Sequence, residues 1–235
     1  MNILICTIVR DRVQALPKWK SQMEALIKAL PDYTFDVAVY ENDSKDGSDK
    51  FIEKVKVEGA SKLFAKTEEL GTTYYESVHS MERVDLLAKA RNACMSLPGN
   101  LEKYTSILWI EPDIIYSTED AVKIITVAIE EKFDILSPLS WMRKPGVIYD
   151  TWATRPPQAP VSYIHGEFII PLFSTFNCFC IYNAQPFIEG VEFSGGDCDT
   201  VQICASFREN GYVRIAALKD CWVHHVENLT DPIFK

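Results

Sequence analysis

Continuous apolar runs alternate with helical spacings through the first two thirds of the chain. Strand-like runs rich in apolar residues lie at residues 2–9, 35–41, 62–66 and 105–111. Between them, apolar residues recur every three or four positions, and this predicts helices at 13–30, from about 49, and at 83–97. Ser117, followed by Asp120, resembles a capping box and predicts the start of another helix. This order predicts an α/β fold with a mixed, mostly parallel sheet flanked by helices.

From about residue 138 onward, the pattern of residues differs from that of the first part of the chain. Prolines and aromatic residues crowd residues 138–171, which predicts long ordered loops with short strands. The pattern then predicts a strand at 175–182, a helix at about 199–210, and strands near 213–218 and 221–226. We expect a single domain over residues 1–235. The change in residue pattern divides it into two halves, 1–137 and 138–235.

Composition narrows the class of protein. The chain has 235 residues, 47% hydrophobic and 24% charged, as in an ordinary globular domain. A net charge of −9 argues against a nucleic-acid partner, because phosphate backbones are bound by clustered Lys and Arg. The first apolar run is too short for a transmembrane segment and lacks the basic flank of a signal peptide. Seven scattered cysteines suggest buried, reduced thiols. We therefore expect a cytoplasmic protein; the pattern specifies no oligomeric state.

Two carboxylates follow the apolar run at 105–111. Glu111 and Asp113 are two residues apart, and alternate side chains of an extended segment share a face. Both acids can therefore point at one Mn²⁺ or Mg²⁺ ion, which would keep coordination positions for the oxygens of a diphosphate. The alternative is a strand end with two solvated acids. We predict a metal site with Asp113 and Glu111 as ligands.

A third metal ligand is expected near the end of the chain. His224 and His225 follow an apolar strand, and an imidazole readily completes a site of this kind. In an extended segment the two rings point to opposite sides, so only one can bind the ion. The sequence leaves open which one binds, and a structural role for both is the alternative.

Five segments in the same order resemble a known family. They are residues 40–48, the helix 83–97 with Ala-Arg-Asn at 90–92, the acidic strand through 117–120, Tyr149-Asp-Thr-Trp-Ala-Thr-Arg155, and 176–179 leading to 185–187. The chain resembles sugar-nucleotide-dependent glycosyltransferases of the GT-A fold. More narrowly, it resembles the fungal capsule-associated α-1,3-mannosyltransferases of glycosyltransferase family 69. Residues 149–155 are the most specific of the five segments.

The resemblance implies a single GT-A, Rossmann-like domain. Residues 1–137 would bind a GDP- or UDP-sugar, and residues 138–235 would bind a saccharide acceptor. The implied reaction is metal-dependent transfer of a hexosyl group with retention, GDP-mannose being one candidate donor. A binding module of the same fold without turnover is one alternative. A nucleotidyltransferase is another, although its usual Gly-rich loop is missing, since residues 7–12 contain no glycine.

The resemblance also points to residues around the donor. Glu41, Asp43 and Ser44 occupy the loop that surrounds the nucleoside in GT-A enzymes, although they equally suit a turn that caps the next helix. The first strand ends beside that loop with three further candidates, Thr7, Val9 and Arg10.

Arg91 has a planar guanidinium that suits phosphate or a neighbouring acid. Glu111 is also a candidate for contact with the ribose or sugar. A structural role in the fold is the alternative for each residue, and we predict a donor contact for both.

The second half of the chain supplies the remaining candidates. Asp150, Trp152 and Arg155 would line the donor or acceptor sugar, with the indole of Trp152 stacking on a pyranose ring. Asp197 and Asp199 open a helix where GT-A enzymes place an acid near the acceptor. We predict that one of them is catalytic, as a general base or as a group that positions the acceptor. Helix capping is the alternative, especially for Asp199.

Overall fold

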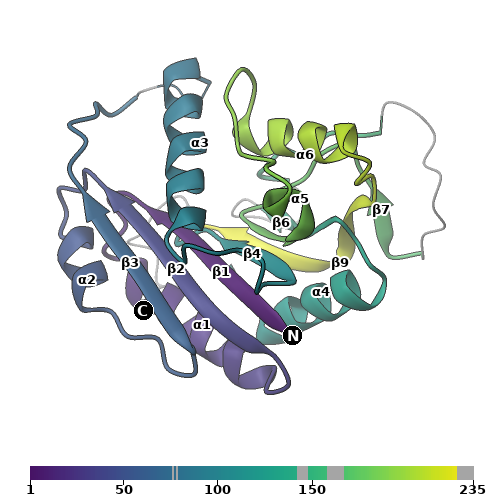
Figure 1. Ribbon diagram of the computed structural model, residues 1–235, viewed down its shortest axis with the longest axis horizontal. Coiled ribbons are helices and arrows are strands. Elements are labelled where there is room, and N and C mark those ends of the chain that lie inside the picture. The colour runs from purple at the N-terminus through teal and green to yellow at the C-terminus, as the bar shows by residue number, and fades with distance from the viewer. Residues whose placement is uncertain (76, 78, 142–147, 158–166, 227–235) are drawn as a thin grey trace.

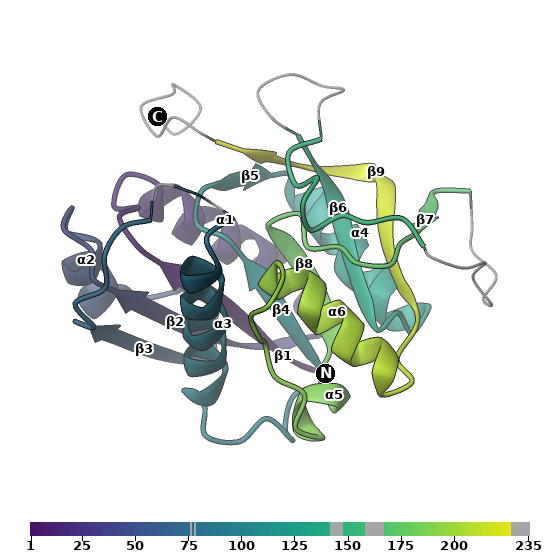
Figure 2. The same cartoon turned by 90° about the horizontal axis from the view of Figure 1, so that it is seen from above.

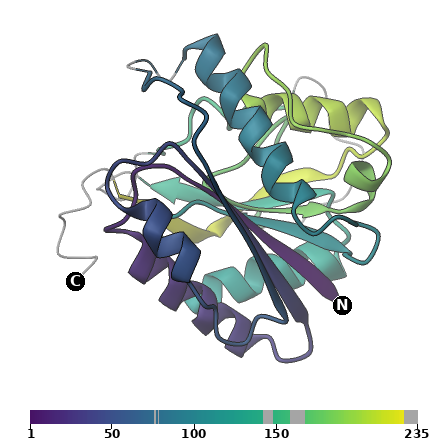
Figure 3. The same ribbon diagram turned by 60° about the vertical axis from the view of Figure 1, so that its left-hand side comes forward.

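The computed structural model describes residues 1–75, 77, 79–141, 148–157 and 167–226. These residues form one sheet between two layers of helices (Figure 1). One layer contains α1 (Leu16–Ala29), α2 (Ser48–Lys54) and α4 (Thr118–Glu130). The other contains α3 (Met81–Ser96), α5 (Gln185–Ile188) and α6 (Asp199–Glu209), and Figure 3 shows the two layers on opposite faces.

Nine strands of the described part of the chain make up the sheet. They are β1 (Asn2–Val9), β2 (Thr34–Asn42), β3 (Lys62–Glu68), β4 (Ser106–Ile110), β5 (Ile114–Tyr116), β6 (Ile135–Trp141), β7 (Ile169–Pro171), β8 (Phe179–Asn183) and β9 (Ile215–His225). Their order is β3-β2-β1-β4-β8-β6-β9-β5, with β7 pairing beside β9. The strands β3, β2, β1 and β4 are parallel, and β8 lies antiparallel between β4 and β6. The predicted mixed sheet flanked by helices is confirmed.

Each central strand contributes to two hydrophobic cores. On β1, Ile3 and Ile5 face the core under α1 and α4, whereas Leu4 and Cys6 face the core under α3 and α6. All four side chains are fully buried, and each large aliphatic one contributes about 1.5–3 kcal/mol to folding. Because both faces are covered, the strand appears in the sequence as an unbroken apolar run.

The structure differs from the predicted elements in the second half of the chain. The strand expected from residue 175 begins only at Phe179, because Asn177 and Cys178 have φ of 53° and 62°, which no extended strand adopts. The two strands expected at 213–226 are one, β9. Its register with β6 shifts between Ser137 and Leu139, at Pro138, and such an irregularity accommodates a residue without an N–H. Residues 142–147 and 158–166 of the predicted loop region lie outside the described residues.

Two local predictions hold in detail. The Ser117 hydroxyl caps α4 by accepting a hydrogen bond from the Asp120 amide at 3.0 Å. The seven cysteines are free and buried, as expected for reduced thiols. Within the described ranges, none of the helices combines the length and apolar character that crossing a membrane requires.

The topology brings several loops to one edge of the sheet. Because β1, β2 and β4 are parallel, the loops that follow them all begin at that edge. Helix α3 lies over the same region and contacts α6, and the two are seen side by side in Figure 2. Open α/β sheets bind ligands at the carboxyl ends of their strands, so the candidate site is expected here.

Candidate functional site

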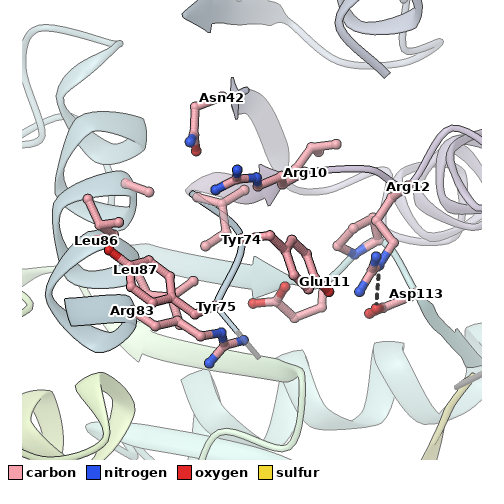
Figure 4. A pocket seen from close by; sticks show the side chains of 14 residues that line it. Arg10, Arg12, Asn42, Tyr74, Tyr75, Arg83, Leu86, Leu87, Glu111 and Asp113 are labelled. Atoms are coloured by element: carbon pink, nitrogen blue, oxygen red, sulfur yellow. Dashed lines mark hydrogen bonds and ion pairs between the residues drawn. The ribbon is translucent and has the colours of Figure 1, made fainter. Parts of the chain in front are cut away.

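A cavity of about 180 Å³ opens at the carboxyl ends of β1 and β4 (Figure 4). One wall is α3, with Arg83, Leu86 and Leu87, and the opposite side carries Arg12 and Asp113. Ala90 of α3 also lines the cavity. The other lining residues come from the ends of β1, β2 and β4 and from the segment before α3: Ile8, Val9, Arg10, Asn42, Tyr74, Tyr75, Glu111 and Pro112.

The cavity carries more positive charge than the chain as a whole. Its lining includes three arginines, Arg10, Arg12 and Arg83, against two acids, Glu111 and Asp113, whereas the whole chain has a net charge of −9. The Arg10 guanidinium donates to the Thr72 hydroxyl at 3.0 Å and to its carbonyl at 2.9 Å. Guanidinium groups suit the oxygens of a diphosphate, so the lining favours a small polyanion.

Asp113 lies two residues beyond Glu111, where β4 has ended. Its Oδ2 accepts a hydrogen bond from Arg12 Nε at 2.8 Å and lies 3.6 Å from Nε2 of His225. Burial alone would raise the pKa of Asp113, but His225 and Arg12 outweigh it and lower the pKa to about 2. The carboxylate is therefore charged across the physiological range.

His225 and His224 face different surroundings. His225 lies opposite Ile114 in the β5–β9 ladder, and its ring stacks on Tyr149 with the centroids 3.7 Å apart. Its Nδ1 is buried without a hydrogen-bond partner among the described residues. His224 is exposed on the other face of β9, beside Trp141 and Trp222. Of the two histidines predicted as metal ligands, only His225 contacts Asp113.

A divalent cation would find two protein ligands here. Asp113 and His225 offer a carboxylate oxygen and an imidazole nitrogen, both of which Mn²⁺ accepts. Across the described ranges, no three His, Cys, Asp or Glu side chains come together as a complete metal site. Ions that act on nucleotides commonly take one or two protein carboxylates and complete their shell with water and phosphate. The donor set thus fits such an ion, and the predicted metal site remains a prediction.

Glu111 points to Arg91 as well as to the cavity. Nη2 of Arg91 donates to Oε1 of Glu111 at 3.0 Å, and Nε of Arg91 donates to Oδ2 of Asp199 at 2.7 Å. Burial raises the pKa of Glu111, and Arg91 opposes that shift. The Arg91 guanidinium lies within 4.5–5.6 Å of the ring centroids of three aromatic residues, Trp109, Phe176 and Phe193.

This arrangement places two predicted site residues inside the fold. Arg91 and Asp199 are each about 4% exposed, and neither lines the cavity. The ion pair between them connects α3 to α6, and the contact with Glu111 extends the connection to β4. In this structure Arg91 and Asp199 position other groups, and a direct donor or catalytic contact for either one stays a prediction.

The segment with left-handed backbone supports Glu111 and Asp150. The carbonyl of Cys178 accepts a hydrogen bond from the Glu111 amide at 2.9 Å, and Oδ2 of Asp150 accepts one from the Asn177 amide at 2.8 Å. Burial raises the pKa of Asp150. Non-glycine residues at positive φ are strained and persist only where surrounding contacts stabilise them, often beside functional sites.

Arg155 and Asp197 form a second ion pair, outside the cavity lining. Both guanidinium terminal nitrogens of Arg155 donate to the Asp197 carboxylate at 2.7 Å, and each side chain is about one third exposed. The ring of Trp152 contacts that of His79 edge-on, with centroids 4.4 Å apart. The pair and the indole thus join the 149–155 loop to the starts of α6 and α3.

The predicted nucleoside loop is extensively hydrogen bonded within the protein. Oε1 of Glu41 accepts from the Ser44 amide at 2.9 Å, and Oγ of Ser44 accepts from the Asp11 amide at 2.9 Å. The Asp43 carboxylate accepts from the Leu70, Gly71 and Thr72 amides and from the Thr72 hydroxyl. These contacts correspond to the turn-forming alternative, and the donor contacts of the three side chains stay predictions.

Thr7 and Val9, the strand-end candidates, differ in their access to the cavity. Thr7 is fully buried, donates to the Ile110 carbonyl at 2.9 Å and accepts from the indole N–H of Trp19 at 3.2 Å. Val9 lines the cavity, as Arg10 does. Thr7 therefore supports the junction of β1, β4 and α1 in this structure.

Several lining residues were not predicted from the sequence, among them Arg12, Asn42, Tyr74 and Tyr75. Two sequence features could have pointed to three of these residues. Asn42 directly follows the predicted site residue Glu41, and Tyr74 and Tyr75 are adjacent aromatic residues in an otherwise polar segment. For Arg12 the sequence contains only its spacing from the end of β1, because its partner Asp113 is 101 residues away.

A comparison with protein families gives one match. A family described as "Cryptococcal mannosyltransferase 1" matches residues 2–208 of the chain. No functionally curated protein sequence matches it.

Solved structures show the fold. TarS of S. aureus in complex with UDP-GlcNAc superposes with a TM-score of 0.60 at 13% identity, over 97% of this chain and 60% of TarS 1-349. The mannosyltransferase PcManGT of Pyrobaculum calidifontis, in complex with GDP-Man and Mn²⁺, gives 0.58 at 12% identity, over 95% and 56%. GalNAc-T7 with UDP, GalNAc and Mn²⁺ gives 0.56 at 11% identity, over 98% and 44%. The fold is therefore GT-A, and the chain spans 60% or less of the length of these three structures.

Proposed function

We propose that this chain, which belongs to the cryptococcal mannosyltransferase 1 family, transfers a hexosyl group from a nucleoside-diphosphate sugar to a saccharide acceptor. One observation carries the proposal. Asp113 and His225 converge beside an arginine-lined cavity at the carboxyl ends of parallel strands. This is where an α/β sheet binds ligands, and the combination of charges suits a diphosphate with its cation.

The cavity would hold the nucleotide part of the donor. Arg10, Arg12 and Arg83 would bind diphosphate oxygens, because a planar guanidinium donates two parallel hydrogen bonds to such groups. Asn42, at the end of β2, and Tyr74 both line the cavity, where they would contact the nucleoside. The N-terminal half, residues 1–137, thus supplies the donor site in this proposal.

A Mn²⁺ or Mg²⁺ ion would be held by Asp113 and His225, with Glu111 close by. When bound, the ion supplies positive charge where the departing diphosphate develops negative charge. Tyr149 would keep the His225 ring in place by stacking on it, since the two planes are only 8° apart.

The sugar-transfer step would take place on the side of α6. Asp197 and Asp199 are both paired with arginines, so neither presents a carboxylate without a counter-ion to an acceptor hydroxyl. This favours a role in positioning the acceptor over proton abstraction, as expected for transfer with retention. Asp150, Trp152 and Arg155 would line the acceptor side, in the half formed by residues 138–235.

The proposed donor is GDP-mannose. Its support is the mannosyltransferase family to which the chain belongs. UDP-sugars are the competing donors, and the experiment below separates them.

Thermal-shift and calorimetric binding of GDP-mannose and UDP-sugars, with and without Mn²⁺, test the proposal. We expect a metal-dependent shift with GDP-mannose and slow release of GDP on incubation. Asp113→Ala should abolish the metal-dependent part of the thermal shift. Asp220→Ala, which removes an ion-paired acid outside the cavity lining, serves as the matched control.

Two results would count against the proposal. A full metal-dependent shift in Asp113→Ala would refute the assigned metal site. Donor binding without release of a nucleoside diphosphate from any donor, even with saccharides added, would instead favour a binding module without turnover.

A further inference from the structure

Arg12 binds the carboxylate oxygen of Asp113 that faces His225. Nε of Arg12 donates to Oδ2 of Asp113 at 2.8 Å, and the same Oδ2 is the atom that faces Nε2 of His225 at 3.6 Å. A cation bound by Asp113 and His225 would therefore share an oxygen with a guanidinium. A cation on this oxygen would repel the guanidinium, because two positive charges that share one partly buried oxygen interact strongly.

The backbone of Arg12 is anchored, whereas its side chain has room to turn. The Arg12 amide donates to the Ser48 hydroxyl at 2.9 Å, and its carbonyl accepts from Ala15 and Leu16 at the start of α1. The side chain is 34% exposed and lines the cavity. Rotation of the side chain would take the guanidinium away from Asp113 while the loop stays in place, and it would also break the hydrogen bond from Nη1 to the Asp11 carbonyl at 3.0 Å.

A diphosphate bound in the cavity is the acceptor to which a displaced Arg12 side chain would turn. Figure 4 shows its guanidinium at the cavity edge, with Glu111 and Tyr74 between it and α3. The Glu111 carboxylate is already paired with Arg91. A diphosphate in the cavity would be the strongest available acceptor for a displaced guanidinium.

We propose that Arg12 is an internal counter-ion that exchanges partners during donor binding. In the empty protein it neutralises Asp113; when Mn²⁺ binds, it is displaced and turns to the diphosphate. This rests on the proposed function, because it takes the Asp113–His225 pair as the cation site. Its consequence is that cation and nucleotide strengthen each other's binding, and thermodynamic linkage makes that effect reciprocal.

The first test measures Mn²⁺ binding in the absence of nucleotide, by calorimetry or by the electron paramagnetic resonance signal of free Mn²⁺. Arg12→Gln should bind Mn²⁺ on the order of tenfold more tightly than wild type, since the ion no longer displaces a charge-assisted hydrogen bond. Arg10→Gln is the matched control, because it removes the same charge from the same cavity without touching Asp113. It should change the affinity far less.

Nucleotide binding at saturating Mn²⁺ is the second test, with GDP and UDP as the probes. Arg12→Gln should weaken binding of the preferred nucleotide on the order of tenfold, and Arg12→Lys should weaken it less. The factor by which nucleotide raises Mn²⁺ affinity should be smaller in Arg12→Gln than in wild type. Circular dichroism and the melting temperature establish that each variant is folded.

The outcomes separate this inference from the proposed function. Equal Mn²⁺ affinity in wild type and Arg12→Gln, with binding lost in Asp113→Asn, would overturn the inference and leave the metal site standing. Tighter Mn²⁺ binding with unchanged nucleotide affinity would overturn the exchange of partners. Unchanged Mn²⁺ binding in Asp113→Asn would overturn the metal site itself.

Discussion

Arg91 and Asp199 form a buried ion pair between residues 108 positions apart in the chain. Nε of Arg91 donates to Oδ2 of Asp199 at 2.7 Å, and each side chain is 5% exposed. Glu111 accepts from the same guanidinium, so three charged groups, on α3, on α6 and directly after β4, meet beside the cavity that Glu111 lines. The geometry of the candidate site therefore depends on Arg91 even though Arg91 does not line the cavity.

Removing Arg91 should strongly destabilise the fold. Arg91→Met would leave Asp199 and Glu111 as uncompensated charges, and breaking a buried pair in this way costs about 3–5 kcal/mol in free energy of unfolding. Urea denaturation measures the loss. Lys89→Met, on the exposed side of the same helix, is the control and should change stability by less than about 0.5 kcal/mol. If Arg91→Met changed the free energy of unfolding as little as Lys89→Met does, the structural role of Arg91 would be contradicted.

Asp43 should make the 70–72 segment sensitive to acid. Burial alone would raise the pKa of Asp43, but hydrogen bonds from Thr72, Asn42 and the Gly71 amide hold the pKa well below its usual value. A carboxyl whose pKa is lowered by folding stabilises the protein above its unfolded pKa of about 3.9, and this contribution is lost as pH falls below that value.

Asp43→Asn should therefore lower the free energy of unfolding by about 1–3 kcal/mol at pH 7. The difference from wild type should shrink as the pH is lowered from about 4 towards 2. Denaturant titrations at several pH values measure it, and hydrogen exchange of the Leu70 and Gly71 amides should accelerate in the variant. A difference that is constant across this pH range would show that the carboxylate charge is not responsible.

The Arg155–Asp197 pair should contribute much less to stability than the Arg91–Asp199 pair. Its side chains are each about one third exposed, so water screens the interaction despite its two short hydrogen bonds. A double-mutant cycle of Arg155→Met and Asp197→Asn should give a coupling free energy of about 1 kcal/mol or less. A coupling of several kcal/mol would mean that the loop 149–155 and α6 form one rigid unit through this pair.

The cysteines should be unreactive in the native protein. All seven are buried, and burial raises the pKa of Cys178 and Cys180 well above the usual value, so little thiolate is available. A chromogenic thiol reagent should react very slowly under native conditions and with all seven thiols in concentrated guanidinium chloride. Rapid reaction of one thiol in the native state would show that the core around that cysteine opens locally.

Local patterns in the chain were sufficient to predict most of the fold. Apolar runs identified β1, β2 and β4 because these strands are covered on both faces, and helical spacing identified α1, α3 and α4. Prediction failed where backbone geometry departs from a regular period. Asn177 and Cys178 delay the start of β8, and Pro138 shifts the register between β6 and β9.

The sequence also predicted part of the chemistry of the candidate site. Glu111 and Asp113 follow an apolar strand, so their spacing alone predicts two acids at the edge of the sheet. The sequence equally suggested the turn that Glu41 and Ser44 form, because their hydrogen-bond partners lie within a few residues or in the neighbouring loop.

Tertiary structure alone decided which side chains meet. Arg12 reaches Asp113 and Arg91 reaches Asp199 across about a hundred residues, and no local pattern encodes such a partner. The choice between the two histidines follows from strand register. Ile114 is paired with His225, and a slip by one residue would turn His224 toward the cavity edge instead. The chain specified the types of residue for the site, whereas long-range pairing of β5 with β9 selected which of them face one another.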